Sequence, residues 1–192
     1  YAGVMSGGGT LALEGSGTLT LSGNNSFTGG LYANPGSKVA VSSDANLGGA
    51  SGSVTLTNAT LKYLSSFDWA PTRTLVTSNG TLDLNGATTT IGGTISGING
   101  LAIQGPGQAT FTGPNTYTGG TSISGGGTLA IAGDAALGNS GGGVTFDNGA
   151  LKFLNSFDLS NTRAVTLNAG GGTIDTNGYD TSLTQQITGG GR

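Results

Sequence analysis

The 192-residue sequence contains neither cysteine nor histidine. These absences exclude disulfide cross-links, zinc sites built on thiolate or imidazole, and Ser-His-Asp or Cys-His nucleophile systems. Charged residues make up only 8% of the chain, against about 25% in an ordinary soluble domain. Any chemistry performed by this chain must therefore use carboxylates, hydroxyls and amides.

Basic residues and long apolar runs are also scarce. Six Lys and Arg against nine Asp and Glu give a net charge of −3, without a basic stripe. Nucleic acid and anionic membrane are therefore not expected as partners. No apolar run approaches the ~20 residues of a spanning helix, so this segment is not expected to insert into a membrane. The opening Tyr1 and the closing Gly189-Gly190-Gly191-Arg192 favour a piece of a longer protein.

Small and polar residues dominate what is present. Gly, Ser, Thr and Asn supply 103 of the 192 residues, and 40 of these are Gly. The chain is nevertheless expected to be ordered, because short blocks such as Gly17-Thr18-Leu19-Thr20-Leu21 recur throughout it. Each block alternates apolar with small or polar residues and is bounded by Gly or Asn, which is the pattern of a short strand with one buried face. The sequence predicts an all-β protein.

The chain is internally duplicated. Residues 15–79 align without a gap on residues 105–169, with identity at 26 of 65 positions, and a two-residue insertion near Gly170 then shifts the offset from 90 to 92. We predict a single β-solenoid over residues 1–192, with one repeat unit at about 15–104 and a second at about 105–192.

A solenoid explains the duplication better than a sandwich or a propeller. A propeller needs several blades of about 40–45 residues, and a sandwich does not require a gapless duplication. At roughly 20 to 25 residues per coil, the chain would form about eight or nine parallel coils in a rod on the order of 40 Å long. Gly and Asn would supply the positive φ values needed at the corners. Alternating aliphatic residues would line the interior, among them Val39 and Val41, Val54 and Leu56, and Leu61 and Tyr63.

Two segments carry a family resemblance. They are Asn24-Asn25-Ser26-Phe27-Thr28-Gly29-Gly30 and Pro114-Asn115-Thr116-Tyr117-Thr118-Gly119-Gly120. Each precedes a predicted strand and then Asp44-Ala45-Asn46-Leu47-Gly48 or Asp134-Ala135-Ala136-Leu137-Gly138. This order resembles the autotransporter-associated β-strand repeat, also called the passenger-associated transport repeat. Pro35 departs from the pattern and argues against a continuous strand across residues 31–38 of the first copy.

The resemblance implies a right-handed parallel β-helix in the secreted passenger of a Gram-negative type V secretion protein, at the cell surface or released. It implies a structural stalk segment that supports export-coupled folding and display, with adhesion as a further role. The expected partners are the rest of a longer chain, stacked at both ends, and a glycan or a second copy. The alternatives are a polysaccharide-acting β-helix enzyme and a glycan-binding or self-recognising adhesin.

Duplicated charges give the first candidate site. Phe67-Asp68 with Arg73 recurs as Phe157-Asp158 with Arg163. An ion pair or turn bracket between neighbouring coils is favoured over a catalytic site, because scaffold positions rather than catalytic ones recur at a repeat period. Other carboxylates on stacked coils could form the pair that glycoside hydrolysis needs, as in Asp147 with Asp175 or Asp83 with Asp68, but no spacing singles out either pair.

Neither a metal nor a cofactor is expected. Asp175-Thr176-Asn177-Gly178 is interpreted as a turn, because it lacks the acidic ligand pattern of a calcium loop. The irregular spacing of Thr-x-Thr pairs argues against an ice-binding surface. No catalytic, cofactor-binding or metal-binding residue is therefore assigned, and the chain is not expected to be an enzyme.

The aromatic residues fall into two groups. Trp69 and Tyr32 are not aromatic in the other copy, so they are the candidates for exposed contact with a glycan or partner. The remainder of this set occupies duplicated positions and is expected in the core or in stacked ladders: Phe27, Tyr63, Phe67, Tyr117, Phe153 and Phe157.

Overall fold

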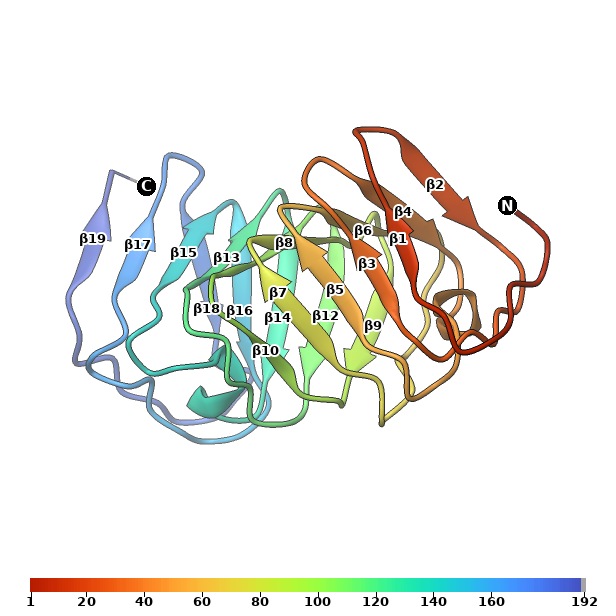
Figure 1. Ribbon diagram of the computed structural model, residues 1–192. Helices are drawn as coiled ribbons and strands as arrows, with labels where there is room; N and C mark the ends of the chain where they lie inside the picture. Colours follow the sequence, from red (N-terminus) through yellow and green to blue (C-terminus); the bar gives the residue numbers. More distant parts are fainter. Residues whose placement is uncertain (191–192) are drawn as a thin grey trace.

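The computed structural model describes residues 1–190 and shows a parallel β-solenoid of about nine turns, with the first and last strands at opposite ends (Figure 1). Two short 3-10 helices, η1 (Asp44–Leu47) and η2 (Asp134–Leu137), interrupt an otherwise all-β chain. The predicted fold class is confirmed. Among residues 1–190, no helix is long and apolar enough to cross a bilayer.

Three parallel sheets form the sides of the solenoid, and we name them sheets A, B and C. Sheet A contains β1 (Leu11–Leu13), β3 (Leu31–Ala33), β5 (Val54–Thr57), β7 (Leu75–Ser78) and β10 (Ile95–Gly97). Sheet B contains β2 (Thr18–Leu21), β4 (Lys38–Val41), β6 (Thr60–Tyr63), β8 (Gly80–Asp83), β11 (Leu101–Gln104), β13 (Thr121–Ser124), β15 (Val144–Asp147), β17 (Val165–Leu167) and β19 (Ile187–Gly189). Sheet C contains β9 (Thr88–Ile91), β12 (Gly107–Phe111), β14 (Gly127–Ile131), β16 (Gly149–Phe153) and β18 (Gly172–Asp175).

The pairing register fixes the length of each coil. In sheet A, Leu11 pairs with Leu31, and Leu31 pairs in turn with Val54. The separation between successive partners is the coil length, and both separations lie within the range predicted from the sequence. Because every ladder is parallel, each coil places its apolar side chains directly above those of the coil before it.

The alternation of apolar and polar residues in the sequence matches the alternation of buried and half-buried side chains in the strands. In β5, Val54 and Leu56 have no exposed surface, whereas Thr55 and Thr57 are half-buried. The interior is one continuous apolar cluster that passes through successive coils. A single coil could not exclude water from its few aliphatic residues, so stacking supplies the core.

Asparagine and glycine take the left-handed conformations at the corners. Within the described residues, all positive-φ residues other than Gly are Asn: Asn58, Asn79, Asn85, Asn148 and Asn177. This outcome confirms the role expected of Asn. Asx side chains tolerate this region better than other non-Gly residues because they can hydrogen-bond locally.

Pro35 lies in a turn rather than in a ladder. β3 ends at Ala33 and β4 begins at Lys38, so strands form on both sides of the proline without crossing it. The Ser37 N–H donates to Asn34 O at 3.0 Å, and Gly36 adopts φ 84°. Proline followed by a positive-φ glycine is the arrangement of a type II turn.

The second repeat unit is rotated by one side of the solenoid relative to the first. β3 of sheet A corresponds in sequence to β13 of sheet B, and β4 of sheet B corresponds to β14 of sheet C. From β3, sheet A continues through β5, β7 and β10, and a loop that stacks on β10 completes the fourth coil before β13 begins. A unit therefore makes four coils and one further side. Sheet B is continuous through both units. It is the second strand-bearing side of each coil in the first unit and the first such side in the second unit.

The rotation moves the side that has loops instead of strands. In the first unit this side stacks on sheet C, where the Trp69 N–H donates to Thr90 O of β9 at 3.0 Å. In the second unit it stacks on sheet A, where the Thr116 N–H donates to Ile95 O of β10 at 2.8 Å. The long loops of the two units therefore lie on different sides of the rod.

Candidate functional site: buried clamps on the loop side

Two arginines on the loop side have no exposed surface. Arg73, just before β7, reaches back to the first residue of η1 in the preceding coil. Its Nε donates to Asp44 Oδ1 at 2.7 Å and its Nη2 donates to Asp44 Oδ2 at 3.0 Å. This two-point pairing is the strongest geometry available to a guanidinium and a carboxylate.

The same guanidinium also satisfies backbone carbonyls at the end of η1. Arg73 Nη1 donates to Leu47 O at 3.3 Å and to Gly52 O at 3.0 Å, while Nη2 donates to Gly48 O at 2.9 Å. A loop cannot place these carbonyls in a β-ladder, and a buried carbonyl without a donor is costly. Arg73 therefore supplies the hydrogen bonds that a strand would supply on the other two sides.

Arg163 repeats this arrangement in the second unit. Its Nε donates to Asp134 Oδ1 at 2.8 Å and its Nη2 to Asp134 Oδ2 at 3.0 Å. Further bonds go to carbonyls at the end of η2, including Leu137 O at 3.2 Å and Gly138 O at 3.3 Å. Burial by itself raises the pKa of Asp134, but the bonds from Arg163 and from the Ser160 N–H, together with the Arg163 charge, lower it below its usual value. We call the Arg73–Asp44 and Arg163–Asp134 arrangements the two clamps.

Glycine makes the clamp loops possible. Gly48 follows η1 with φ 92°, and a Cβ atom there would lie 2.8 Å from Phe27 O of the preceding coil. Gly138 repeats this with φ 72° and a Cβ position 2.5 Å from Tyr117 O. The glycine that follows leucine in each clamp loop is thus required both by backbone conformation and by close approach of the coils.

The structure corrects the predicted partner of each arginine. Asp68 does not pair with Arg73; its Oδ1 accepts the Thr90 N–H of the next coil at 2.7 Å. Asp158 likewise accepts the Ser182 N–H at 2.6 Å. Asp68 and Asp158 therefore do join neighbouring coils, as predicted. Each arginine, however, forms its ion pair with the aspartate that begins the 3-10 helix of the preceding coil. Asp44 and Asp134 also occupy duplicated positions and precede Arg73 and Arg163 by the same number of residues. The sequence therefore contained this alternative pairing.

Two buried asparagines support the same loops. Asn25 Oδ1 accepts the Met5 N–H of the preceding coil at 2.8 Å, and its Nδ2 donates to Asn46 O of the following coil at 2.8 Å. Asn115 accepts the Ile95 N–H at 2.8 Å and donates to Ala136 O at 2.7 Å. Each side chain therefore joins three consecutive coils on the side that has no ladder.

Trp69 is buried, which makes the prediction of an exposed contact wrong. Only 3% of its surface is exposed, and its Nε1 donates to the hydroxyl of Tyr63 at 2.7 Å. In the second unit Phe153 and Leu159 take these two places, so an apolar pair replaces a hydrogen-bonded one. Trp69 is absent from the second copy because its partner changed with it, not because it faces solvent. Tyr32 is 41% exposed, as expected.

A second pair changes in the opposite direction. The hydroxyls of Tyr117 and Thr121 lie 2.7 Å apart in the core, where the first unit has Phe27 and Leu31. Burial raises the pKa of Tyr117 to about 12, and the Thr121 bond only partly opposes this. Burial likewise raises the pKa of Tyr63. The other duplicated aromatics are in the core or stack on it, as Phe67 does on Tyr63 with ring centres 5.0 Å apart.

The remaining carboxylates named from the sequence each have another partner. Of the predicted pair Asp147 and Asp175, the first ends β15 of sheet B and the second ends β18 of sheet C, where Asp175 faces Lys152 at 3.7 Å. Of the other pair, Asp83 faces Lys62 at 3.9 Å, and Asp68 accepts the Thr90 N–H as described above. Asp147 Oδ1 accepts the Gly170 N–H at 2.8 Å. The predicted turn follows β18 at residues 176–179, where the Tyr179 N–H donates to Thr176 O at 2.8 Å, and Asp175 at the end of the strand accepts the Asn177 N–H at 2.9 Å. Across residues 1–190, no three acidic side chains gather at a position that could hold a metal ion.

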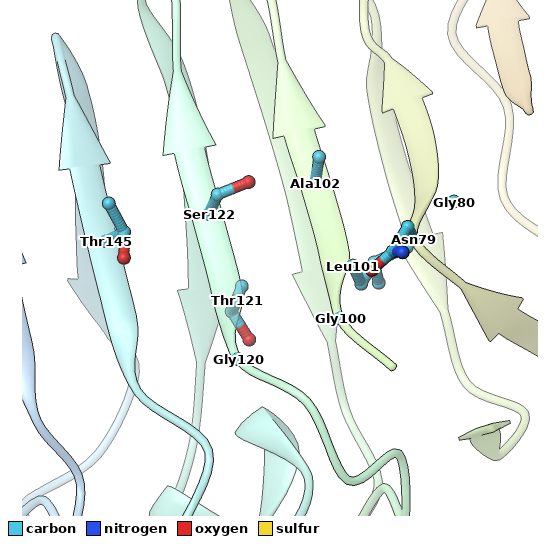
Figure 2. A pocket seen from close by; sticks show the side chains of 9 residues that line it. All are labelled: Asn79, Gly80, Gly100, Leu101, Ala102, Gly120, Thr121, Ser122 and Thr145. Carbon is cyan, nitrogen blue, oxygen red and sulfur yellow. The ribbon is translucent and has the colours of Figure 1, made fainter. Parts of the chain in front are cut away.

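One surface hollow lies where strands of sheet B begin (Figure 2). It has a volume of about 290 Å³, and its side chains come from neighbouring coils. The lining offers hydroxyls, one amide and small apolar groups, with no charged side chain: Asn79, Gly80, Gly100, Leu101, Ala102, Gly120, Thr121, Ser122 and Thr145. It therefore holds no acid or base.

A scan against protein-family models matches the passenger-associated transport repeat at residues 14–34 and 104–131. The chain carries two passenger-associated transport repeats. The two matches begin at equivalent positions of the duplicated units, and the first ends just before the Pro35 turn, where the two copies diverge. Asn25 and Asn115 lie within the repeats, whereas the clamp residues follow them. Searches of curated proteins and of solved structures returned no match.

The clamps should dominate the stability of the loop side. Replacing Arg73 by Met leaves the Asp44 carboxylate and four backbone carbonyls without this donor, and we expect a loss of about 3–5 kcal/mol in the free energy of unfolding by urea. Lys62→Gln removes only an exposed ion pair and should cost about 0–1 kcal/mol. Equal losses in the two variants would contradict the role given to the clamp.

Tyr117 should make the protein sensitive to alkali. The unfolded phenol ionises near pH 10 and the folded one at about 12, so the unfolded state loses its proton first and stability falls as pH rises between these values. The double variant Tyr117→Phe/Thr121→Leu, which carries the residues of the first unit, should show a shallower fall in urea midpoint over this range. A fall as steep as that of the wild type would refute this.

The Tyr63–Trp69 pair should show strong coupling. Tyr63→Phe leaves a buried indole N–H without its acceptor, which should cost about 1–3 kcal/mol. Adding Trp69→Leu completes the pair found in the second unit, so the double variant should lose less than the sum of the two single losses. Urea unfolding of all four proteins measures the coupling, and strict additivity would argue against the pairing.

Proposed function

We propose that this chain is a non-catalytic structural segment of an autotransporter passenger, secreted to the bacterial cell surface. The observation that carries the proposal is the presence of two transport repeats within one continuous solenoid interior. The buried and duplicated charges support it, because Asp44, Arg73, Asp134 and Arg163 are occupied in joining coils. Its role is to extend and to display what is attached to it.

The clamps are suited to folding during export. Each joins side chains of adjacent coils that are close in sequence, so it closes as soon as two coils have emerged, whichever end leads. Coils of a solenoid contact mainly their neighbours, which allows the interior to grow coil by coil. Within the described residues, β1 and β2 at one end and β18 and β19 at the other each pair on one edge only. Further coils of a longer chain are the partners that these edges fit.

Export can be tested by placing the chain between a signal peptide and an outer-membrane translocator domain. We expect the wild type to be cleaved by protease added to intact cells. The amount of the Arg73→Met/Arg163→Met variant at the cell surface should be several-fold lower. Without the clamps, the loops do not hold adjacent coils together, so the exported chain folds less efficiently outside the cell. The control Lys62→Gln/Lys152→Gln removes two exposed cations and should match the wild type. Retention of the wild type, or full display of the clamp variant, would contradict the proposal.

A further inference from the structure

A polar groove lies on sheet B, distinct from the clamps and from the hollow of Figure 2. It has a volume of about 410 Å³ and crosses five neighbouring strands, from β2 to β11. Its lining consists of Thr18, Thr20, Lys38, Ala40, Thr60, Lys62, Leu64, Asp83 and Gln104. The groove therefore follows the axis of the solenoid rather than a single strand.

The register arranges the groove side chains in two rows. One row runs through Thr18, Lys38 and Thr60, and the other through Thr20, Ala40, Lys62, Asp83 and Gln104. Ala40 follows Lys38 on the same face of β4 and pairs directly with Lys62 on β6. The short Ala40 side chain thus lies between Lys38 on its own strand and Lys62 on the next strand, so a lysine stands on each side of it in the groove.

Lys38 differs from the other cations. Of the Lys and Arg side chains in residues 1–190, Lys62, Arg73, Lys152 and Arg163 each face a carboxylate within 4.0 Å, whereas Lys38 pairs with none. In a chain with a net charge of −3, an exposed cation between two threonines has no structural partner. An exposed ion pair such as Lys62–Asp83 is weak, so Lys62 can also bind an added anion.

Some groove residues recur in the second unit and others occur only in the first. Lys62 and Asp83 recur as Lys152 and Asp175, which marks this ion pair as part of the repeated scaffold. Lys38 does not recur, because Thr128 holds its place in the second unit, and Ala150 holds the place of Thr60. The first unit therefore has a cation and a hydroxyl that the solenoid itself does not need.

We propose that this groove binds a carboxylated polysaccharide, with uronate carboxylates at Lys38 and Lys62 and sugar hydroxyls at Thr18, Thr20, Asp83 and Gln104. Four strand spacings of about 4.8 Å give a length of roughly 20 Å along the axis, enough for a short oligosaccharide. β4, β6 and β8 are paired on both edges, so a peptide cannot add to them as a strand. The groove has no aromatic platform on which nucleic acid bases could stack.

The test is titration calorimetry of the intact chain with oligogalacturonate, at low and at raised salt. We expect binding that weakens as salt rises, because the contacts are exposed charges. The Lys38→Thr/Thr60→Ala variant installs residues that the second unit already accommodates, and it should bind about tenfold more weakly while its thermal unfolding stays unchanged. Lys152→Thr, which removes the equivalent scaffold lysine outside the groove, should bind like the wild type.

Several results would overturn the proposal. These are no binding of oligogalacturonate, undiminished binding by the folded Lys38→Thr/Thr60→Ala variant, and equal weakening by Lys152→Thr. Equal binding of the neutral, carboxyl-reduced oligosaccharide would remove the role of the lysines. Equal binding of poly-glutamate would show a general anion surface rather than a polysaccharide site. None of these results depends on export, so the proposed structural role is tested separately.

Discussion

The loop side of the solenoid has no β-ladder, and the backbone groups there must still be satisfied. On the sides that carry strands, parallel pairing joins each coil to the next. On the loop side, isolated backbone bonds between coils are supplemented by buried side chains: Asn25 and Asn115 each join three coils, and Arg73 and Arg163 each join two. A chain with so few charges places two of its arginines in full burial because a guanidinium can serve several carbonyls and a carboxylate at once.

The repeat length then determines how these clamps are presented. Because a unit is four coils and one further side, its clamp faces a different side from the clamp of the preceding unit. Sheet B runs unbroken through both units, because both units contribute strands to this one side of the solenoid. That continuity creates a long exposed surface on which residues from several coils align. The groove around Lys38 lies on this surface, away from both clamps.

Much of the fold could be predicted from the sequence because its causes are local. Alternation such as Val54-Thr55-Leu56-Thr57 depends only on which face of a strand is buried, and the positive-φ asparagines depend only on their own backbone. The partner of Arg73 could not be predicted in the same way, because it depends on which coil lies beneath the loop. Trp69 shows the same limit: its change between units indicated exposure, yet the cause was a concerted change with Tyr63 in the core. The rotation of the second unit arises because the repeat unit is longer than four coils by one side of the solenoid. This excess depends on the lengths of all the coils in the unit, so it could not be predicted from a single motif.

The clamps hold the coils together on the loop side, where no β-ladder joins them. Hydrogen exchange of Arg73→Met, read by mass spectrometry, tests this role most directly. We expect faster exchange over residues 42–53 and the adjoining loop 22–30, with the strands of sheet B and the second-unit loop around Arg163 still protected. Uniform deprotection of the whole solenoid, or unchanged exchange over residues 42–53, would contradict it.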